Sequence, residues 1–261
     1  MKRARVTIAG LGLIGGSLAR ALSGQGYSVV GVDTQRVRRK ARESGAVART
    51  SASLERGIQE ADVLVLAAPP QANVAMLRRI ARADVPGLVI TDVSSVKVPI
   101  CREAERLGMR EFVGGHPMAG RAEVGWRGSQ AELFQGCTWA MVGGAARARH
   151  RVARVIRDVG ARPFSVNAED HDRAVAFLSH VPQLVAWALL EAAQSDEVAA
   201  RNLALAGPGF RDMTRLAASP RGLWREILSA NTPEVKRALA ALRRALGARP
   251  RVAVASARKA G

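Results

Sequence analysis

The fold is decided by the stretch Arg5-Val6-Thr7-Ile8-Ala9-Gly10-Leu11-Gly12-Leu13-Ile14-Gly15. An apolar strand, residues 5–9, leads into three glycines with the spacing GxGxxG, and a helix is expected at about residues 14–25. In this pattern the first glycine allows a tight turn, the second lets the backbone approach a pyrophosphate, and the third lets helix and strand pack closely. The amino end of the helix offers N–H groups to phosphates. We therefore predict a dinucleotide-binding unit in which the cofactor contacts Gly10, Gly12, Leu13, Ile14 and Gly15.

An acidic residue follows at the distance that this motif requires. Asp33 lies 18 residues beyond Gly15, at the end of a second expected strand, residues 28–32. A carboxylate there hydrogen-bonds the ribose hydroxyls of NAD and repels the additional phosphate of NADP. Arg36 leaves NADP open as the less favoured cofactor. We expect NAD, with the rest of the cofactor-binding set being Asp33, Pro69 and Ser94.

The first two thirds of the chain alternates short strands with helices. Strands are expected at residues 5–9, 28–32, 62–67, 88–91, 112–113 and 138–142, and helices at 14–25 and 36–44. The runs at 62–67 and 88–91 are aliphatic or β-branched without polar alternation, which indicates strands buried on both faces, as in a parallel sheet. Repeated strand–helix units of this length predict a doubly wound, Rossmann-like α/β domain.

From about residue 168 the strands stop and Ala/Leu-rich segments follow. Helices are expected at 173–193, 197–205, 210–217, 223–229 and 233–246, with turn residues such as Gly207-Pro208-Gly209 between them. We predict a dinucleotide-binding domain at residues 1–167 and an all-helical substrate and dimerisation domain at 168–248. Residues 249–261 are basic and rich in small residues, and we expect a flexible tail.

The chain of 261 residues has a formal net charge of +18, which is the charge of a nucleic-acid binder. However, 35 of its 40 basic residues are arginine, and they are scattered along helices rather than gathered in one block with aromatic residues. Nucleic-acid binding is therefore not expected.

No apolar run approaches the roughly 18 residues that a membrane span requires, so the sequence predicts no integral membrane protein. Residues 1–6 lack a secretory signal pattern. Cys101 and Cys137 have no neighbours at metal-ligand spacing, so we expect two reduced thiols, no metal site and a cytoplasmic protein.

Short-chain dehydrogenases use a Tyr with a Lys four residues later, but Gly31 stands at that distance from Tyr27, the single tyrosine. The catalytic lysine of β-hydroxyacid dehydrogenases is also missing from the helical segments. A histidine is then the natural proton acceptor near pH 7. His116 is the favoured candidate, because it follows a strand in a glycine-rich loop, Gly114-Gly115-His116-Pro117-Met118-Ala119-Gly120.

The other three histidines have simpler interpretations. His150 lies among arginines on an exposed-looking helix. His171 begins a helix, where capping or packing is at least as well supported as chemistry. His180 faces either the core or the cleft.

Several motifs, in order along the chain, resemble those of the prephenate/arogenate dehydrogenases of tyrosine biosynthesis. The resemblance covers nearly the whole chain and is most specific in GHPMAG and GFRDMTRLA. The matching segments are Gly10–Gly16, residues 92–97 (DVSSVK), 115–120 (GHPMAG), 171–172 (HD), 179–182 (SHVP) and 209–217 (GFRDMTRLA), followed by Trp224.

The resemblance implies hydride transfer coupled to loss of CO2 from a ring that carries a C4 hydroxyl and a C1 carboxylate. It assigns His116 as acceptor of the hydroxyl proton and Ser95 as the residue that orients His116 and contacts the same hydroxyl. Arg215 clamps a substrate carboxylate, a task suited to its bidentate guanidinium, and Asp212 and Thr214 hold that arginine. No metal is needed, because loss of CO2 makes the ring aromatic. The remaining substrate-binding residues are His180, Gln183 and Trp224.

One position departs from the family pattern. Many prephenate-specific relatives read Ser-His-Leu-Pro-His where this chain ends the motif with Gln183. A neutral amide thus replaces an imidazole beside the substrate side chain, which is a keto acid in prephenate and an amino acid in arogenate. Either substrate, or both, stays open. Lys97 is either structural or adds positive charge to the site.

In the family that the chain resembles, the helical domain forms the dimer, and here it is small and rich in Ala and Leu. We expect a homodimer with its clefts between the domains. The chain ends shortly after the last helix, which leaves no room for an appended regulatory domain, so feedback by tyrosine would act at the active site.

Two alternatives stay open from the sequence. A β-hydroxyacid or imine reductase would share the two-domain plan, although the missing lysine and the GHPMAG segment disfavour it. An NAD(H)-sensing DNA-binding regulator would use the +18 charge, but no recognition-helix module is visible.

Overall fold

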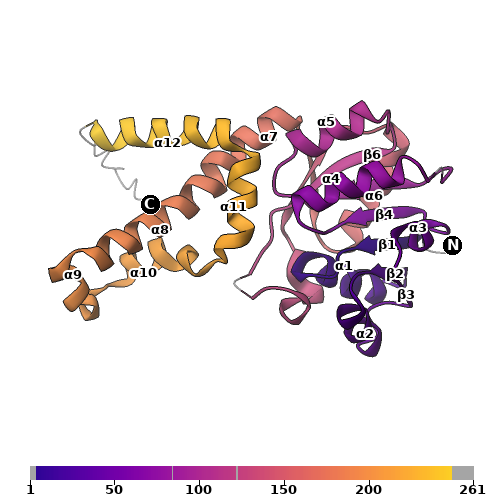
Figure 1. Cartoon of the computed structure of the whole chain (residues 1–261), viewed down its shortest axis with the longest axis horizontal. Helices are drawn as coiled ribbons and strands as arrows, with labels where there is room; N and C mark the ends of the chain where they lie inside the picture. Colours follow the sequence, from indigo (N-terminus) through magenta and orange to yellow (C-terminus); the bar gives the residue numbers. More distant parts are fainter. Residues whose placement is uncertain (1–3, 84, 122, 249–261) are drawn as a thin grey trace, which may run out of the picture.

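A computed structural model describes residues 4–83, 85–121 and 123–248. Figure 1 shows a sheet domain with helices on both faces, and a second, helical domain that extends to one side of it. The expected tail, residues 249–261, lies outside the described residues.

In the described part of the chain the sheet has eight strands, in the order β3-β2-β1-β4-β5-β6-β7-β8. The first six positions are parallel, so the carboxyl ends of β1, β4, β5 and β6 share one edge. The strands are β1 (Arg5–Ala9), β2 (Ser28–Val32), β3 (Arg49–Ser51), β4 (Val63–Leu66), β5 (Val89–Asp92), β6 (Phe112–Pro117), β7 (Thr138–Val142) and β8 (Arg162–Ser165).

Two hydrophobic clusters hold helices against the two faces of the sheet, as the apolar runs at 62–67 and 88–91 predicted. Val63 and Val65 point into the cluster with α1, α2 and α6, whereas Leu64 and Leu66 point into the cluster with α3, α4 and α5. The helices are α1 (Leu13–Gly24), α2 (Gln35–Glu43), α3 (Leu54–Ile58), α4 (Pro70–Ile80), α5 (Val98–Arg106) and α6 (Ala146–Asp158), with 3-10 turns η1 (Trp126–Gly128) and η2 (Ala131–Phe134).

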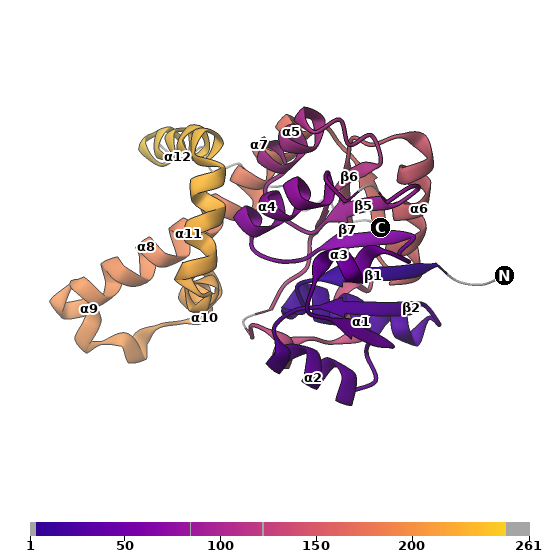
Figure 2. The same ribbon diagram turned by 45° about the vertical axis from the view of Figure 1, so that its right-hand side comes forward.

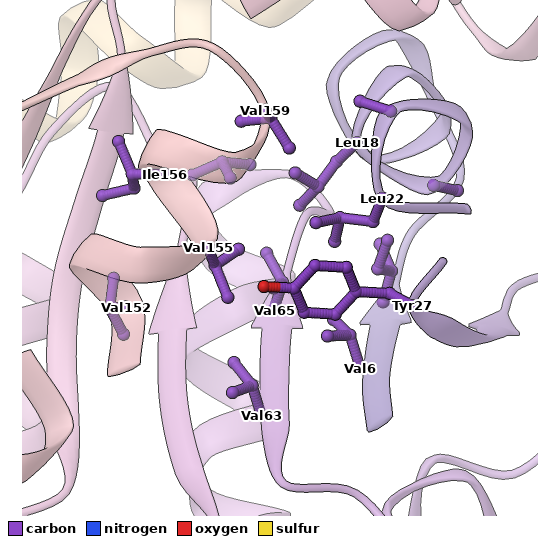
Figure 3. Packing of buried hydrophobic residues seen from close by; sticks show 14 of the residues in the cluster. Val6, Leu18, Leu22, Tyr27, Val63, Val65, Val152, Val155, Ile156 and Val159 are labelled. Carbon is purple, nitrogen blue, oxygen red and sulfur yellow. The ribbon is translucent and has the colours of Figure 1, made fainter. Parts of the chain in front are cut away.

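Tyr27 is part of the first cluster. Figure 3 shows its ring among side chains of β1, β4, α1 and α6, including Val6, Leu22 and Val155. Its hydroxyl donates to Asp158, 2.6 Å away, which satisfies the one polar atom that the ring carries into the core. The single tyrosine is thus a core residue.

The sheet departs from the sequence prediction at its far edge. β7 runs antiparallel to β6, with His116 opposite Ala140, and β8 pairs in parallel with β7. The chain between β6 and β7 passes over α1 through η1 and η2 instead of forming a crossover helix. Without such a crossover the chain returns in the opposite direction. The short strands β3 and β8 were not predicted.

The strand predicted at residues 112–113 extends to Pro117, so His116 lies on β6 and not in a loop. Gly114 and Gly115 misled the prediction. A Cβ on Gly115 would approach the Asp92 carbonyl, and one on Gly114 would lie 2.8 Å from Cys101 Sγ. These glycines therefore serve close packing of a buried strand.

The helical domain begins with a helix that starts earlier than predicted, at Ala168, where the Asn167 side chain accepts the Asp170 N–H. A π-helical turn interrupts this helix just before Pro182. Proline has no N–H and its ring collides with the carbonyl four residues earlier, so the preceding turn widens. The elements are α7 (Ala168–Val175), the π turn η3 (Ala176–His180), α8 (Val181–Ser195), α9 (Glu197–Arg201), η4 (Leu203–Leu205), α10 (Pro208–Thr214), η5 (Arg215–Ala218), α11 (Arg221–Ala230) and α12 (Thr232–Gly247).

The joined helix, residues 168–195, is long and apolar enough by length and composition to cross a membrane, with a mean hydropathy of 1.4 and 33% of that window buried. This corrects the expectation that no segment reaches that threshold. Its polar side chains nevertheless bond within the protein, since Gln183 and Trp187 donate to the carbonyls of Leu216 and Ala217. We interpret it as the central helix of the second domain.

The two domains meet through α7 and α11, which pack on α5 and α4. Figures 1 and 2 both place α11 between the sheet domain and the rest of the helical domain. The helical core is small: Ala176, Val181, Val235 and Ala238 are its buried members.

Candidate active site

Each glycine of the loop after β1 has a different environment. Gly10 has a φ of +100°, and a Cβ there would lie 2.6 Å from the Ala67 carbonyl carbon. A Cβ on Gly15 would collide with the Gly10 carbonyl oxygen. A Cβ on Gly12, in contrast, would meet nothing within 4 Å. The loop is therefore packed on its inner side and open at Gly12, at the amino end of α1, which is the cradle that a pyrophosphate fits.

Asp33 follows β2 and faces this loop. One carboxylate oxygen accepts the Leu11 N–H at 2.7 Å and the other accepts the Thr34 N–H at 2.6 Å. Each oxygen has a further lone pair, so the carboxylate both fixes the glycine loop and can accept ribose hydroxyls. These residues fit NAD.

Asn73, which the sequence analysis missed, joins the ends of β4 and β5. Its amide nitrogen donates to Ser94 Oγ at 2.9 Å, and its carbonyl accepts the Ala68 N–H at 3.1 Å. Ser94 is thereby fixed at the edge of the sheet that holds the glycine loop. Pro69, exposed at the start of α4, lies at the same edge. An isolated Asn inside a helix gives no sequence signal for this role.

Lys97 is fully buried and forms an ion pair of 2.5 Å with Asp92. Its ammonium also donates to the Gly115 carbonyl at 2.6 Å, while the Gly115 N–H donates to Asp92 at 2.9 Å. The pair therefore holds both backbone groups of the residue before His116. Of the two roles left open for Lys97, the contacts support the structural one.

His116 lies at the end of β6, and its Nδ1 is 2.9 Å from Nε2 of His171 on α7. The rings meet edge to face, with centroids 5.1 Å apart. Nδ1 of His171 lies 2.7 Å from Asp172, whose two oxygens accept the backbone N–H groups of Lys97 and Val98. Asp172 thus caps α5 from the neighbouring domain.

Burial holds the pKa of His116 well below its ordinary value of 6.5, and the nearby His171, Lys97 and His180 lower it further. Neutral imidazole is therefore the resting form of His116. A neutral imidazole with a free ring nitrogen can accept a proton from a hydroxyl group.

His180 lies in the π turn and is buried. Its Nδ1 is 3.2 Å from the amide nitrogen of Asn231, which also donates to the Asp172 carbonyl at 2.7 Å. Burial lowers the pKa of His180 to about 4, against the opposing effect of Asp172. Its ring meets Trp224 edge to face, with 6.0 Å between centroids, and Trp224 meets Trp187 at 6.3 Å.

Gln183 is fully buried on α8. Its amide nitrogen donates to the Leu216 carbonyl at 2.8 Å, and its amide oxygen has no hydrogen-bond partner among the described residues. The bond fixes η5, the turn that begins with Arg215, against α8.

Other implied contacts differ in the structure. The hydrogen-bond partner of His116 Nδ1 is His171 and not Ser95. Ser95 forms no hydrogen bond within the described ranges. Thr214 donates to the Phe210 carbonyl at 2.7 Å in its own helix rather than holding Arg215. Arg215 is exposed and, within residues 4–83, 85–121 and 123–248, has no ion pair with Asp212. Thr214 has a short polar side chain, which can reach the backbone of its own helix and therefore bonds there instead of to Arg215.

A doubly wound sheet with an open glycine loop, an acid placed for ribose, and a neutral imidazole at the same edge defines a two-domain dinucleotide-binding protein of the Rossmann class. Comparison with known proteins narrows this class. Residues 18–164 match the family model "Prephenate dehydrogenase, nucleotide-binding domain", and residues 167–253 match "Prephenate dehydrogenase, dimerization domain". The chain belongs to the prephenate dehydrogenase family.

Individual relatives agree with this assignment. A prephenate dehydrogenase of Lactococcus lactis subsp. cremoris is 32% identical over 240 residues, which is 88% of this chain and 66% of the relative. This chain therefore spans a little under two thirds of that relative's length. The arogenate dehydrogenase structure from Synechocystis has a TM-score of 0.82 and 30% identity, covering 93% of this chain and 89% of the other.

A prephenate dehydrogenase structure from Aquifex aeolicus, in complex with hydroxyphenyl propionate and NAD+, has a TM-score of 0.83 and 26% identity, covering 95% of this chain and 89% of the other. Likenesses below 25% identity, to a 3-hydroxyisobutyrate dehydrogenase and an imine reductase, extend to the fold alone. The alternative of a β-hydroxyacid or imine reductase is thus not favoured.

Proposed function

We propose that this protein catalyses the NAD-dependent oxidative decarboxylation of prephenate, arogenate or both. The observation that carries the proposal is the half-buried, neutral imidazole of His116 at the sheet edge that also holds Gly12, Asp33 and Ser94. The family and the names of its relatives support the same reaction.

In this reaction a hydride leaves C4 of the substrate ring, and bound NAD would supply its acceptor. Gly12 would leave room for the pyrophosphate, and the Asp33 carboxylate would accept the ribose hydroxyls. Preference for NAD over NADP is supported by the Asp33 carboxylate, which would lie against the additional phosphate. Nε2 of His116 accepts the C4 hydroxyl proton, and loss of CO2 from C1 leaves an aromatic ring.

For the substrate side chain, the proposal retains Arg215 as the carboxylate ligand and His180, Gln183 and Trp224 as neighbours. The unpartnered Gln183 amide oxygen can accept a hydrogen bond, as an ammonium group would offer. This feature favours arogenate as a substrate, although an amide can also donate to a keto group.

We further propose a homodimer formed by the helical domain. Among the described residues, eight of the eleven exposed large apolar side chains lie in this domain, including Leu178 at 80% and Leu205 at 83% exposure. Exposed apolar surface of this kind marks an interface. The free Cys101 and Cys137 support a reducing, cytoplasmic location.

The test of the proposed reaction is NADH formation from prephenate and from arogenate, measured side by side by absorbance, with NAD and with NADP. We expect turnover of at least one substrate and a higher kcat/KM with NAD. His116→Asn should lower kcat by about 100-fold or more while NAD affinity is kept. Absence of turnover with both substrates and both cofactors would refute the proposal.

A further inference from the structure

A hydrogen-bonded row of three side chains connects β6 to α7. It runs from His116 through His171 to Asp172, with separations of 2.9 and 2.7 Å. We propose that His171 and Asp172 are positioning residues, which hold a proton on Nδ1 of His116 and take up the positive charge that His116 acquires during the reaction. This inference rests on the proposed function, because it takes His116 as the base.

The direction of donation follows from Asp172. Its Oδ1 accepts the Lys97 N–H at 2.7 Å and its Oδ2 accepts the Val98 N–H at 2.8 Å. An ionised carboxylate can only accept, so Nδ1 of His171 carries a proton. Neutral His171 then has a bare Nε2, and His116 Nδ1–H donates to it. Nε2 of His116 is left without a proton, which is the tautomer that a base requires.

The same row of side chains can also accept the positive charge that His116 acquires. Protonated His116 would be a half-buried cation, and no carboxylate in the described part of the chain is in direct contact with it. Transfer of its Nδ1 proton to His171 would place the cation beside Asp172 instead. The ionisable groups around the two imidazoles come from β5, the start of α5, α7 and η3, and they are Asp92, Lys97, Asp172 and His180. Asp92 is already paired with Lys97, so Asp172 is the carboxylate that remains for an imidazolium.

The proton movements balance. As C4 loses its hydride to the cofactor of the proposed function, the substrate hydroxyl proton passes to Nε2 of His116, the C4 carbonyl forms, and the Nδ1 proton passes to Nε2 of His171. The bond between C1 and the carboxylate breaks, its electron pair enters the ring, and CO2 leaves. The ring oxygen then recovers a proton from Nε2 of His116, and the proton on His171 returns to His116.

Two substitutions of His171 distinguish its two proposed functions. One function is to keep the proton on Nδ1 of His116, and the other is to take up the positive charge. His171→Phe keeps the ring volume and removes both functions. His171→Gln places an amide near the position of Nε2, so it can accept the His116 Nδ1–H but cannot become a cation. We expect a fall in kcat of about 100-fold for His171→Phe, a smaller fall for His171→Gln, and an unchanged Kd for NAD in both.

The pH profile distinguishes this role from a merely structural one. In the wild type, the row offers an added proton a second imidazole, that of His171, 2.7 Å from the Asp172 carboxylate. In His171→Gln only His116 can take that proton, so the acid limb of kcat/KM should move to lower pH. A limb that stays in place would overturn the charge-sharing role.

A second readout needs no turnover. In protein with ¹⁵N-labelled histidine, NMR should show His116 as the Nδ1–H tautomer in the wild type and in His171→Gln, and a population of the Nε2–H tautomer in His171→Phe. Wild-type His116 with its proton on Nε2, or an unchanged tautomer in His171→Phe, would overturn the inference. If the wild type turns over neither substrate, the proposed function fails, and the NMR result still decides the tautomer.

The matched control is His150→Gln, which alters an exposed histidine on α6 and should keep wild-type kcat and pH profile. Thermal unfolding checks that each variant is folded. If His171→Phe does not fold, the acid limb of His171→Gln carries the test.

Discussion

The three glycines of the loop after β1 are required for different physical reasons. At Gly10 and Gly15 a side chain would collide with backbone, whereas at Gly12 it would enter open space. Gly12 also has a φ of −72°, which alanine adopts without strain. The reason for a glycine at position 12 is therefore found only when the cofactor is considered.

We predict that Gly12→Ala folds with a melting temperature near that of the wild type but binds NAD at least about tenfold more weakly, a loss of about 1.4 kcal/mol. Gly15→Ala should instead destabilise the fold, because its Cβ collides with the Gly10 carbonyl oxygen. Thermal unfolding and NAD titration measure the two effects. Equal NAD affinity in Gly12→Ala and the wild type would show that the pyrophosphate does not lie at this loop.

At the same scale, the sequence proposes roles for residues that have local signals, and these roles stay predictions. The glycines and Asp33 stand in a motif whose spacing indicates a dinucleotide, and His116 stands in the GHPMAG segment that resembles the family. The partners of His116 could not be predicted, since His171 is 55 residues away and its ring direction depends on how α7 packs on α5. Asn73 and Asn231 carry hydrogen bonds that likewise arise only from the folded arrangement.

At the scale of elements, patterns predicted most of the central strands and missed the edges. The β-branched runs of β4 and β5 are buried on both faces and gave a clear signal. β3 has three residues, and β8, Arg162–Ser165, carries an arginine and a proline, so neither resembles a buried strand. β6 was shortened in the prediction because paired glycines usually indicate a loop, whereas here they fit beside Asp92 and Cys101.

The π turn places a buried histidine where its charge state affects stability. The pKa of His180 is lowered from 6.5 to about 4 by burial. Between these values the unfolded chain binds a proton that the folded protein does not, so the free energy of unfolding falls as pH falls from 6.5 towards 4. His180→Asn retains an acceptor for Asn231 and cannot titrate.

We therefore predict that the loss of stability between pH 7 and pH 5 is smaller in His180→Asn than in the wild type. His116 contributes in the same direction, so a part of the loss should persist in the variant. Urea unfolding at the two pH values measures the difference. The same loss in both proteins would contradict a buried, neutral His180.

At the scale of the whole molecule, the hydrogen-bonded row of His116, His171 and Asp172 connects the two domains. Asp172 belongs to the helical domain, yet it caps α5 of the sheet domain, and His171 beside it reaches β6. A shift of the helical domain would therefore move the partner of His116 as well as the helices that carry the proposed substrate-binding residues. The short helix α7 therefore connects the surroundings of His116 to the position of the helical domain.

The small helical core and its exposed apolar side chains give the last prediction. With four buried members in its core cluster, this domain cannot cover Leu178, Leu205 and Leu246 by itself. Changing these three leucines to Asp should convert the proposed homodimer to a monomer at micromolar concentration, as measured by light scattering, because charged groups would be buried at the interface. The matched control is Phe164→Asp, whose side chain is 57% exposed on β8 of the sheet domain. That variant should stay dimeric. A monomeric wild type, or a triple variant that remains dimeric, would place any subunit contact elsewhere.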